Sequence, residues 1–233
     1  MTSSEESPTT YFIEKHYKDA FDKIGKDKQQ RILDAAIAEF STKGFIAANI
    51  NVIAKNAGIS IGSMYNYFQS KERLFLTIVD HGYAVLEKVI SSVDLTKGDI
   101  FDKLEMMLRL AQDYSRQYPE LSQIYLDLTS GGLAHLSKTV SRQMESITAD
   151  FYQTMMADAK KTGIMAQDMD EQVTAFCLDN LMVMLQFSAT SEYYKERLKI
   201  FAGDDALDND EKIIQGMMRF IRRALAPQPQ PEK

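Results

Sequence analysis

The sequence predicts an all-α protein, and three observations support this class. Five prolines occur in 233 residues, at positions 8, 119, 227, 229 and 231, so residues 9–118 and 120–226 lack the strongest helix breaker. Apolar residues recur at helical spacing, as in the series Ile100, Phe101, Leu104, Leu108 and Ala111. No segment shows the apolar-polar alternation that is typical of a strand. We therefore expect helices joined by short turns and no β-sheet.

The first expected helix covers residues 28–43. Asp27 and Gln30, three residues apart, resemble a capping box, in which each of two side chains bonds the backbone N–H of the other residue. Gly44 supplies the stop expected at a helix C-terminus. Residues 9–25 are expected to form an extra helix against this part of the chain, and residues 1–8 to be disordered.

Two short helices and one long helix are expected next. Asn49 is placed to cap a short helix that Gly58 ends, and Ser60 to cap a second one over about residues 61–67. Ser70 precedes a long helix, reaching about residue 93, whose apolar residues share one face.

The remainder of the chain is expected to hold five more helices, with breaks at Gly131-Gly132, Gly163 and Gly203. The tail from Pro227, which alternates proline with polar residues, is expected to be disordered. The five helices are expected near residues 99–117, 120–129, 133–161, 169–200 and 209–225.

Composition excludes several classes of protein. With 45% hydrophobic and 26% charged residues, the chain is long and apolar enough for one or two domains with a real core. The single cysteine, Cys177, forms no intrachain disulfide and makes no ligand cluster with the three histidines, so we expect neither a metal nor a cofactor. No apolar run reaches the roughly 18 residues of a membrane span, and the charged N-terminal residues do not form a signal peptide. These features predict a cytoplasmic protein without a membrane segment.

Charge is unevenly distributed along the chain. The net charge of −6 argues against nonspecific coating of nucleic acid. Residues 43–80 nevertheless hold four basic and two acidic side chains, whereas residues 81–233 hold 17 basic and 23 acidic ones. A small cationic segment is thus attached to an acidic body, although charge alone leaves ordinary surface variation equally open.

The two short helices and the turn at Gly58 form a helix-turn-helix, because glycine permits the tight connection. Such a unit can place its second helix in the major groove of DNA. In that helix Ser63 can bond base edges or phosphates, while Tyr65 and Tyr67 each offer a phenolic donor. The motif therefore predicts a DNA contact through residues 61–68.

A longer spaced pattern surrounds this motif. It reads Ile32-Leu33-x-Ala35-Ala36-x-x-x-Phe40-x-x-x-Gly44-Phe45, then Ile53-Ala54-x-x-Ala57-Gly58-Ile59-Ser60-x-Gly62-Ser63-Met64-Tyr65-x-Tyr67-Phe68-x-Ser70-Lys71-Glu72-x-Leu74. This pattern closely resembles the DNA-binding domain of the TetR family of bacterial transcriptional regulators. The resemblance covers about residues 28–80, whereas the rest of the chain resembles the family only in the number and order of its helices.

The resemblance implies which residues contact DNA. The family reads bases from the start of the second short helix and anchors phosphates through residues at its end and at the start of the long helix. Here Ile61, Gly62 and Ser63 match the reading positions, and Tyr65, Tyr67 and Lys71 match the anchoring ones. The expected DNA-contacting set is Asn49, Ser60, Ile61, Gly62, Ser63, Tyr65, Tyr67 and Lys71.

One departure from the family pattern affects the expected DNA contacts, and the tyrosines have an alternative interpretation. The family more often has threonine or serine at the position of Asn49, and Ile61 offers no hydrogen bond, so readout there rests on a thymine methyl or is absent. Tyr65 and Tyr67 also fit interior aromatics with satisfied hydroxyls. Lys71 near a helix start opposes the macrodipole, which favours an external reason for it such as a phosphate.

The last two long helices predict a homodimer. Apolar residues surround the helix from 176 to 187, and such a helix must be buried on every side. A partner subunit satisfies this requirement, and the family resemblance also implies dimerisation through these helices. Burial wholly within one chain is the alternative. The expected interface consists of Leu181, Met184, Ile214, Met217, Met218 and Ile221.

Methionines and aromatic residues are concentrated after residue 100. Flexible thioethers line adaptable apolar cavities, although most such residues belong to a core. The resemblance implies a small-molecule inducer site in this region, and the scarcity of buried charge suggests an apolar or amphipathic ligand. The expected lining is Met106, Leu110, Tyr114, Tyr125, Phe151, Met155, Phe176 and Asn180.

These observations favour a ligand-responsive transcriptional regulator, a repressor that binds palindromic operator DNA as a homodimer and is released by a small molecule. No phosphate loop, activated nucleophile or recognisable carboxylate pair supports an enzyme. A helical adaptor that binds proteins through the acidic body stays open, and salt-sensitive DNA binding would separate the two classes. The expected divisions are an N-terminal extension (1–26), the helix-turn-helix domain (27–80), a ligand-binding and dimerisation domain (81–226) and a disordered tail (227–233).

Overall fold

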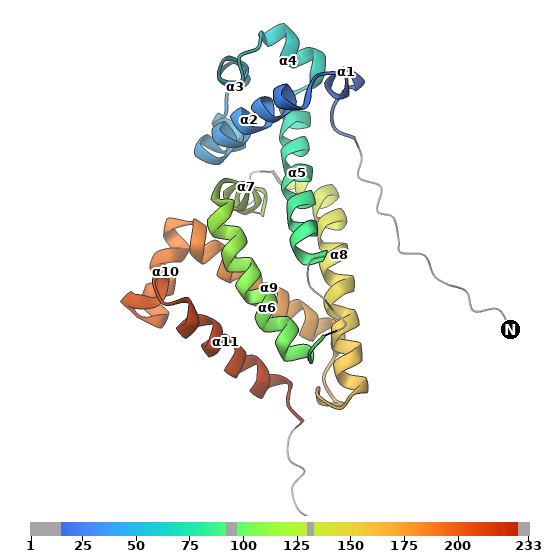
Figure 1. The fold of residues 1–233 in the computed structure, drawn as a ribbon, viewed down its shortest axis with the longest axis vertical. Coiled ribbons are helices and arrows are strands. Elements are labelled where there is room, and N and C mark those ends of the chain that lie inside the picture. Colours follow the sequence, from blue (N-terminus) through green and yellow to red (C-terminus); the bar gives the residue numbers. More distant parts are fainter. Residues whose placement is uncertain (1–14, 92–96, 130–132, 228–233) are drawn as a thin grey trace, which may run out of the picture.

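The fold is all-α, as the sequence predicts. The computed structural model describes residues 15–91, 97–129 and 133–227, and every regular element in these ranges is a helix (Figure 1). The elements are α1 (Asp19–Asp22), α2 (Lys26–Ala47), α3 (Ile50–Asn56), α4 (Ile61–Tyr67), α5 (Lys71–Ser91), α6 (Ile100–Gln117), α7 (Pro119–Thr129), α8 (Ala134–Lys161), α9 (Glu171–Thr190), α10 (Glu192–Ala202), a 3-10 turn η1 (Asp204–Leu207) and α11 (Asp210–Leu225).

Two apolar cores organise these helices. The first lies among α1–α5 and α7, and the second among α6, α8, α9 and α11. Figure 1 shows α1–α4 gathered at one end of the molecule, with α5 running from them toward the second group of helices. The expected domain boundary at residue 80 falls inside α5, and the division stays a prediction.

The cap residues of the short helices are confirmed. The Asn49 side chain accepts the Asn51 N–H, and that of Ser60 accepts the Ser63 N–H. Ser70 Oγ accepts the Arg73 N–H over 3.2 Å at the start of α5. The regular part of α2 ends at Gly44, where φ is +67° and ψ is 166°. That backbone region is open almost only to glycine.

The expected capping box at Asp27 and Gln30 is wrong. Helix α2 begins at Lys26, and its cap is the backbone of Gly25, whose carbonyl accepts the N–H groups of Lys28 and Gln29. The Gln29 side chain donates to the Phe21 carbonyl over 2.7 Å, so the preceding segment is tied to the first turn of α2. This tertiary contact moves the start of the helix ahead of Asp27.

Two expected helix lengths also need correction. Of the helix expected over 9–25, only α1 forms among residues 15–25, and residues 9–14 lie outside the described ranges. The helix expected over 169–200 divides at Ser191, which takes an extended conformation without any glycine or proline. Across this bend, the Phe187 ring of α9 contacts Tyr194 of α10 at a centroid distance of 5.6 Å, and it also contacts Tyr125 of α7 at 5.8 Å. Aromatic packing therefore favours the break.

Helix α9 passes a composition test that the sequence interpretation did not anticipate. Among the described helices, it alone is long and apolar enough to cross a membrane by length and composition. Only 33% of its most apolar window is buried in this chain. It nevertheless contacts α6, α7, α8 and α10, which is the position of a core helix.

The conformation of Gly44 gives a stability prediction. Gly44→Ala should lower the free energy of unfolding by about 1–3 kcal/mol, because alanine is strained in this backbone region. Urea denaturation measures the change. Gly62→Ala is the control, since Gly62 lies in a helix and a Cβ there would be 3.8 Å from its nearest neighbour. Equal losses in the two variants would contradict the assignment of strain to Gly44.

Candidate nucleic-acid interface and internal cavity

The pair α3 and α4 is held by a tight turn and a shared core. Gly58 has φ +69°, a conformation that suits glycine, and the Ile59 N–H donates to the Ala54 carbonyl over 3.0 Å. Ile53 and Met64 are completely buried between the two helices. The pair is therefore a rigid helix-turn-helix whose outer face is free for contacts.

The exposed face of α4 carries most of the residues expected to contact DNA. Ile61 exposes 38% of its surface and Tyr65 48%. Gly62 is exposed beside them. The hydroxyl groups of Ser60 and Ser63 lie 2.9 Å apart, so both residues belong to the first turn of this face. Asn49 lies apart from this group, at the start of α3, where its side chain is used as a cap.

Two of the expected phosphate contacts are engaged within the protein. Tyr67 exposes only 6% of its surface and packs against Phe21, which fits the interior alternative and does not fit an accessible phosphate ligand. The Lys71 Nζ donates to the carbonyls of Ile46 and Ala48, each over 3.0 Å. An ammonium group has three N–H donors, so Lys71 retains one for a further partner.

The segment before α2 supports α4, a role that sequence reasoning missed. The Lys18 N–H donates to the Tyr67 carbonyl over 2.8 Å, and Lys18 Nζ donates to the Tyr65 carbonyl over 2.9 Å. These bonds satisfy carbonyls at the C-terminal end of α4 that have no partner within the helix. Phe21 adds a ring contact to Phe68 at 4.9 Å. The N-terminal segment thus fixes the helix that carries the candidate contacts.

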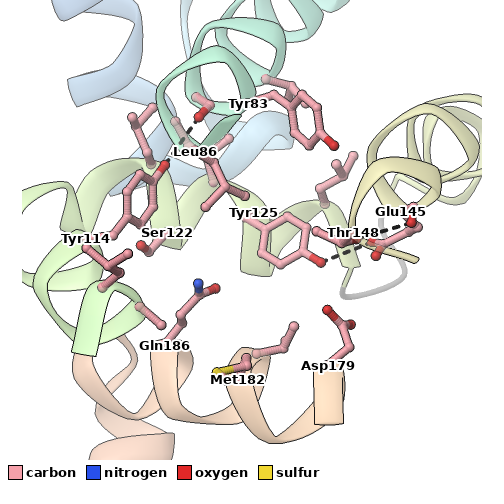
Figure 2. Close-up of a pocket in the computed structure, with 18 of the residues that line it drawn as sticks. Tyr83, Leu86, Tyr114, Ser122, Tyr125, Glu145, Thr148, Asp179, Met182 and Gln186 are labelled. Atoms are coloured by element: carbon pink, nitrogen blue, oxygen red, sulfur yellow. Dashed lines mark hydrogen bonds between the residues drawn. The ribbon is translucent and has the colours of Figure 1, made fainter. Parts of the chain in front are cut away.

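A cavity lies between the two cores (Figure 2). It holds about 1110 Å³ of space free of atoms, including its opening to solvent. Its walls come from α5, α6, α7, α8 and α9. Most of the lining is apolar, but Tyr114, Ser122, Tyr125, Glu145, Thr148, Asp179 and Gln186 add polar groups. A mostly apolar lining with a few polar groups is typical of a small-molecule site.

The structure places three of the eight expected pocket residues in this cavity. Leu110, Tyr114 and Tyr125 line it. Met155 is buried in the second core, and Phe176 and Asn180 point to the outside of α9, with 68% of Phe176 exposed. Met106 and Phe151 pack against the second core and do not line the cavity. Residues on α5, including Ile78, Val79, Gly82, Tyr83 and Leu86, line the cavity instead.

One end of the cavity is acidic, contrary to the expected scarcity of charge. Figure 2 shows the carboxylates of Asp179 and Glu145 and the hydroxyl of Tyr125 directed toward one another. The Tyr125 hydroxyl donates to Glu145 Oε1 over 3.1 Å. Burial, with a smaller contribution from Glu145, raises the pKa of Asp179 to about 6. The sequence offered one signal, a charged residue in the middle of the apolar stretch 173–187.

Comparisons with known proteins agree with this geometry. Residues 32–78 match the family of bacterial regulatory proteins called tetR. A Bacillus subtilis protein named as the uncharacterized HTH-type transcriptional regulator YdgC is 28% identical over 154 residues, which are 66% of this chain and 76% of that protein.

Solved structures share the whole fold. A TetR family transcriptional regulator from Chloroflexus aurantiacus superposes with a TM-score of 0.70 at 18% identity, over 91% of this chain and 99% of the other. The regulator FadR from Bacillus subtilis, solved in complex with stearoyl-CoA, gives 0.67 at 15% identity, over 84% and 98% of the two chains.

Residues 32–78 of the chain form a TetR-family DNA-binding domain. The matched residues include the helix-turn-helix formed by α3 and α4, so this domain lies at the N-terminal end of the chain. At the identities found, the structural likeness shows the fold and not the ligand.

The expected dimer residues need revision. Ile214, Met218 and Ile221 are each 1% exposed and lie in the second core of the same chain, so they offer no surface to a partner. Leu181 and Met217 are partly buried against that core. Met184 is exposed, and the other exposed large apolar residues of α9 and α11 are Val173, Phe176 and Phe220.

The engagement of Lys71 predicts a role without DNA. Lys71→Ala should lower the free energy of unfolding of the DNA-free protein by about 1–2 kcal/mol, because two charge-assisted hydrogen bonds to the end of α2 are lost. Thermal or urea denaturation measures this loss. The exposed Lys55 on α3 is the control, and Lys55→Ala should change the value by less than about 0.5 kcal/mol. Unchanged stability in Lys71→Ala would mean that these bonds contribute nothing.

Proposed function

We propose that this protein is a ligand-responsive transcriptional repressor of the cytoplasm. In this proposal a homodimer binds a near-palindromic operator, and a small apolar or amphipathic molecule releases it. The observation that carries the proposal is helix α5, which starts beside the helix-turn-helix and lines the cavity. Lys71 is its first residue, and Val79, Tyr83 and Leu86 face the space where a ligand would lie.

Helix α7 gives a second connection between the cavity and the DNA-binding domain. Leu121, Ile124 and Leu128 line the cavity and also belong to the first core, which contains the buried faces of α2, α3 and α4. A ligand that moves α7 or α5 therefore acts on the packing of the DNA-binding domain. Because a ligand can shift an equilibrium only by its differential affinity, it must fit better when these helices leave the DNA-bound arrangement.

We assign direct DNA contacts to the exposed surface around α4. Ile61, Gly62 and Ser63 would face base edges, and Tyr65 would bind a phosphate. Asn49 and Ser60, at the starts of α3 and α4, lie where helix N-termini attract phosphates. The third N–H donor of Lys71 would bind a phosphate, while the buried Tyr67 would only position α4.

We place the dimer interface on the exposed apolar surfaces of α9 and α11. Val173, Phe176 and Met184 on α9 and Phe220 on α11 are exposed in the single chain. In such a dimer, protein would bury α9 from both sides, which would explain why its composition is as apolar as that of a membrane span. Twofold symmetry would place the two α4 helices on successive half-sites, roughly 34–36 Å apart.

FadR, solved with stearoyl-CoA, supports an effector that joins an apolar body to a polar group. The mixed lining of the cavity fits that general class. A protein-binding adaptor is the competing function, favoured by the acidic body and by exposed Tyr193, Ile200 and Phe201 on α10. Salt-sensitive binding to a defined DNA sequence separates the two, because only the regulator neutralises phosphates.

Removing one hydroxyl tests the DNA contact. Tyr65→Phe should weaken binding to the DNA upstream of its own gene about fivefold, the effect of one hydrogen bond of about 1 kcal/mol. Fluorescence anisotropy measures the affinity on specific and nonspecific duplexes, and the loss should be similar on both, because phosphates carry no sequence information. Tyr193→Phe on α10 is the matched control. A loss confined to the specific duplex would place Tyr65 at a base instead.

A charge on α9 tests the dimer. Phe176→Glu should convert the dimer to a monomer at micromolar concentration, because the carboxylate would be desolvated at the interface. Sedimentation velocity measures the mass. Phe201→Glu on α10, where the phenylalanine is 76% exposed, should stay dimeric. A monomeric wild-type chain, or loss of the dimer only in Phe201→Glu, would refute this interface.

A further inference from the structure

We propose that the effector of this chain is an amphipathic cation, with an apolar body in the cavity and one positively charged nitrogen between Asp179 and Glu145. This inference rests on the proposed function, because it names the chemical class of the ligand for the same cavity. It goes beyond the general expectation of an apolar or amphipathic molecule by fixing the sign of the polar group.

The first argument is the placement of the carboxylates. Asp179 on α9 and Glu145 on α8 line the same end of the cavity, and Figure 2 shows Asp179 directed toward the Tyr125 hydroxyl and the Glu145 carboxylate. The Tyr125 hydroxyl donates to Glu145, which fixes that carboxylate from the side of α7. Two like charges held together at an apolar surface repel each other, and a cation between them relieves the repulsion.

The second argument is the lack of positive charge in the lining. Among the side chains that the structure describes, no lysine, arginine or histidine lines the cavity. Burial and the neighbouring Glu145 carboxylate both raise the pKa of Asp179. A carboxylate or phosphate group of a ligand would therefore meet negative charge without a compensating partner. The cavity selects against anionic amphiphiles by the same geometry that favours cations.

The third argument is the remainder of the lining. Tyr83, Tyr125 and Tyr152 line the cavity together with Asp179, and the faces of aromatic rings attract quaternary and protonated amines. Leu86, Leu110, Leu121 and other aliphatic side chains supply the apolar part of the lining. The cavity thus offers carboxylates and aromatic rings for a cation and aliphatic side chains for a hydrocarbon body.

Three probes with one decyl chain and different head groups test the charge. They are decyltrimethylammonium, decanol and decanoate, titrated below their micelle concentrations by isothermal calorimetry at about pH 7.5. The ammonium should bind at least about tenfold more tightly than the alcohol, and decanoate should bind most weakly, because one chain length keeps the apolar contribution nearly constant. Equal affinities, preference for decanoate, or no binding of the ammonium would overturn the proposal.

Neutral isosteres test the two carboxylates. Asp179→Asn should reduce the preference for ammonium over alcohol to within about threefold, and Glu145→Gln should reduce it in the same direction. Asp158→Asn, an exposed position on α8 outside the cavity, is the matched control and should keep the wild-type preference. Retention of the full preference in both cavity variants would show that the carboxylates do not select the cation.

Stability supplies a readout that does not depend on any ligand. The ionised form of Asp179 is disfavoured by the fold, so its cost accumulates as the pH rises through the interval from 3.8 to about 6. At about pH 7.5, Asp179→Asn should therefore raise the melting temperature of the ligand-free protein, by about 2–4 °C or more. A lowered melting temperature would indicate that the carboxylate is structural.

The pH dependence of binding follows from the same group. The titratable groups that line the cavity with Asp179 are Glu145 and Tyr152 from α8, Tyr125 from α7, Tyr114 from α6 and Tyr83 from α5. Burial raises the pKa values of Tyr125 and Tyr152, so these two tyrosines stay neutral. Between about pH 7.5 and 5, protonation of Asp179 should weaken ammonium binding and leave decanol binding unchanged. Equal ammonium affinity at both values would contradict the role of Asp179.

A parallel titration with operator DNA keeps the two proposals apart. Binding of the ammonium should weaken DNA binding, and DNA should weaken ammonium binding by the same factor. If the protein binds no upstream DNA, the proposed function fails while the calorimetric result on head-group charge stands. If DNA binds but decanol or decanoate is preferred, only the inference about the ligand fails.

Discussion

The shared burial of helix α5 is the constraint on which the rest of the structure depends. Its first turns supply Leu74, Phe75 and Ile78 to the core of the DNA-binding domain, where they are almost completely buried. The same helix then lines the cavity with Tyr83 and Leu86. Protein cores pack at near-crystalline density and deform little. Because α5 is fixed in the first core and also lines the cavity, a displacement of α5 at the cavity is passed to the first core. The arrangement of α5 therefore links any occupant of the cavity to the position of α4.

The lining of the cavity includes a feature that lowers the stability of the fold and suits a binding site. A well-packed core would fill this space and would not hold the Asp179 carboxylate at its wall, because burial disfavours its ionised form. Here Asp179 retains a raised pKa, and Glu145 is held by Tyr125. A buried ionisable group of this kind departs from the packing of an ordinary core, and such departures are expected at functional sites.

Local signals in the sequence were sufficient for the framework. The scarcity of proline, the helical spacing of apolar residues and the caps at Asn49, Ser60 and Ser70 correctly predicted the fold class and most helix boundaries. The spaced motif over residues 32–74 was enough to indicate the family. These features act over a few residues, so they can be read in order along the chain. The capping box at Asp27 failed because the backbone of Gly25 caps α2, whose first turn is also tied to the preceding segment by the bond from Gln29 to the Phe21 carbonyl.

The sequence by itself therefore determined the helices, their order and the helix-turn-helix, whereas the tertiary structure decided which faces meet. The structure places Leu110 and Tyr114 at the cavity, whereas Phe176 points outward and Ile221 is buried within its own chain. Both apolar faces of a helix look alike in sequence, since the period of 3.6 residues says that a face is buried but not against what. The gathering of Glu145, Asp179 and Tyr125 from three helices depends on how those helices cross, which no local pattern encodes.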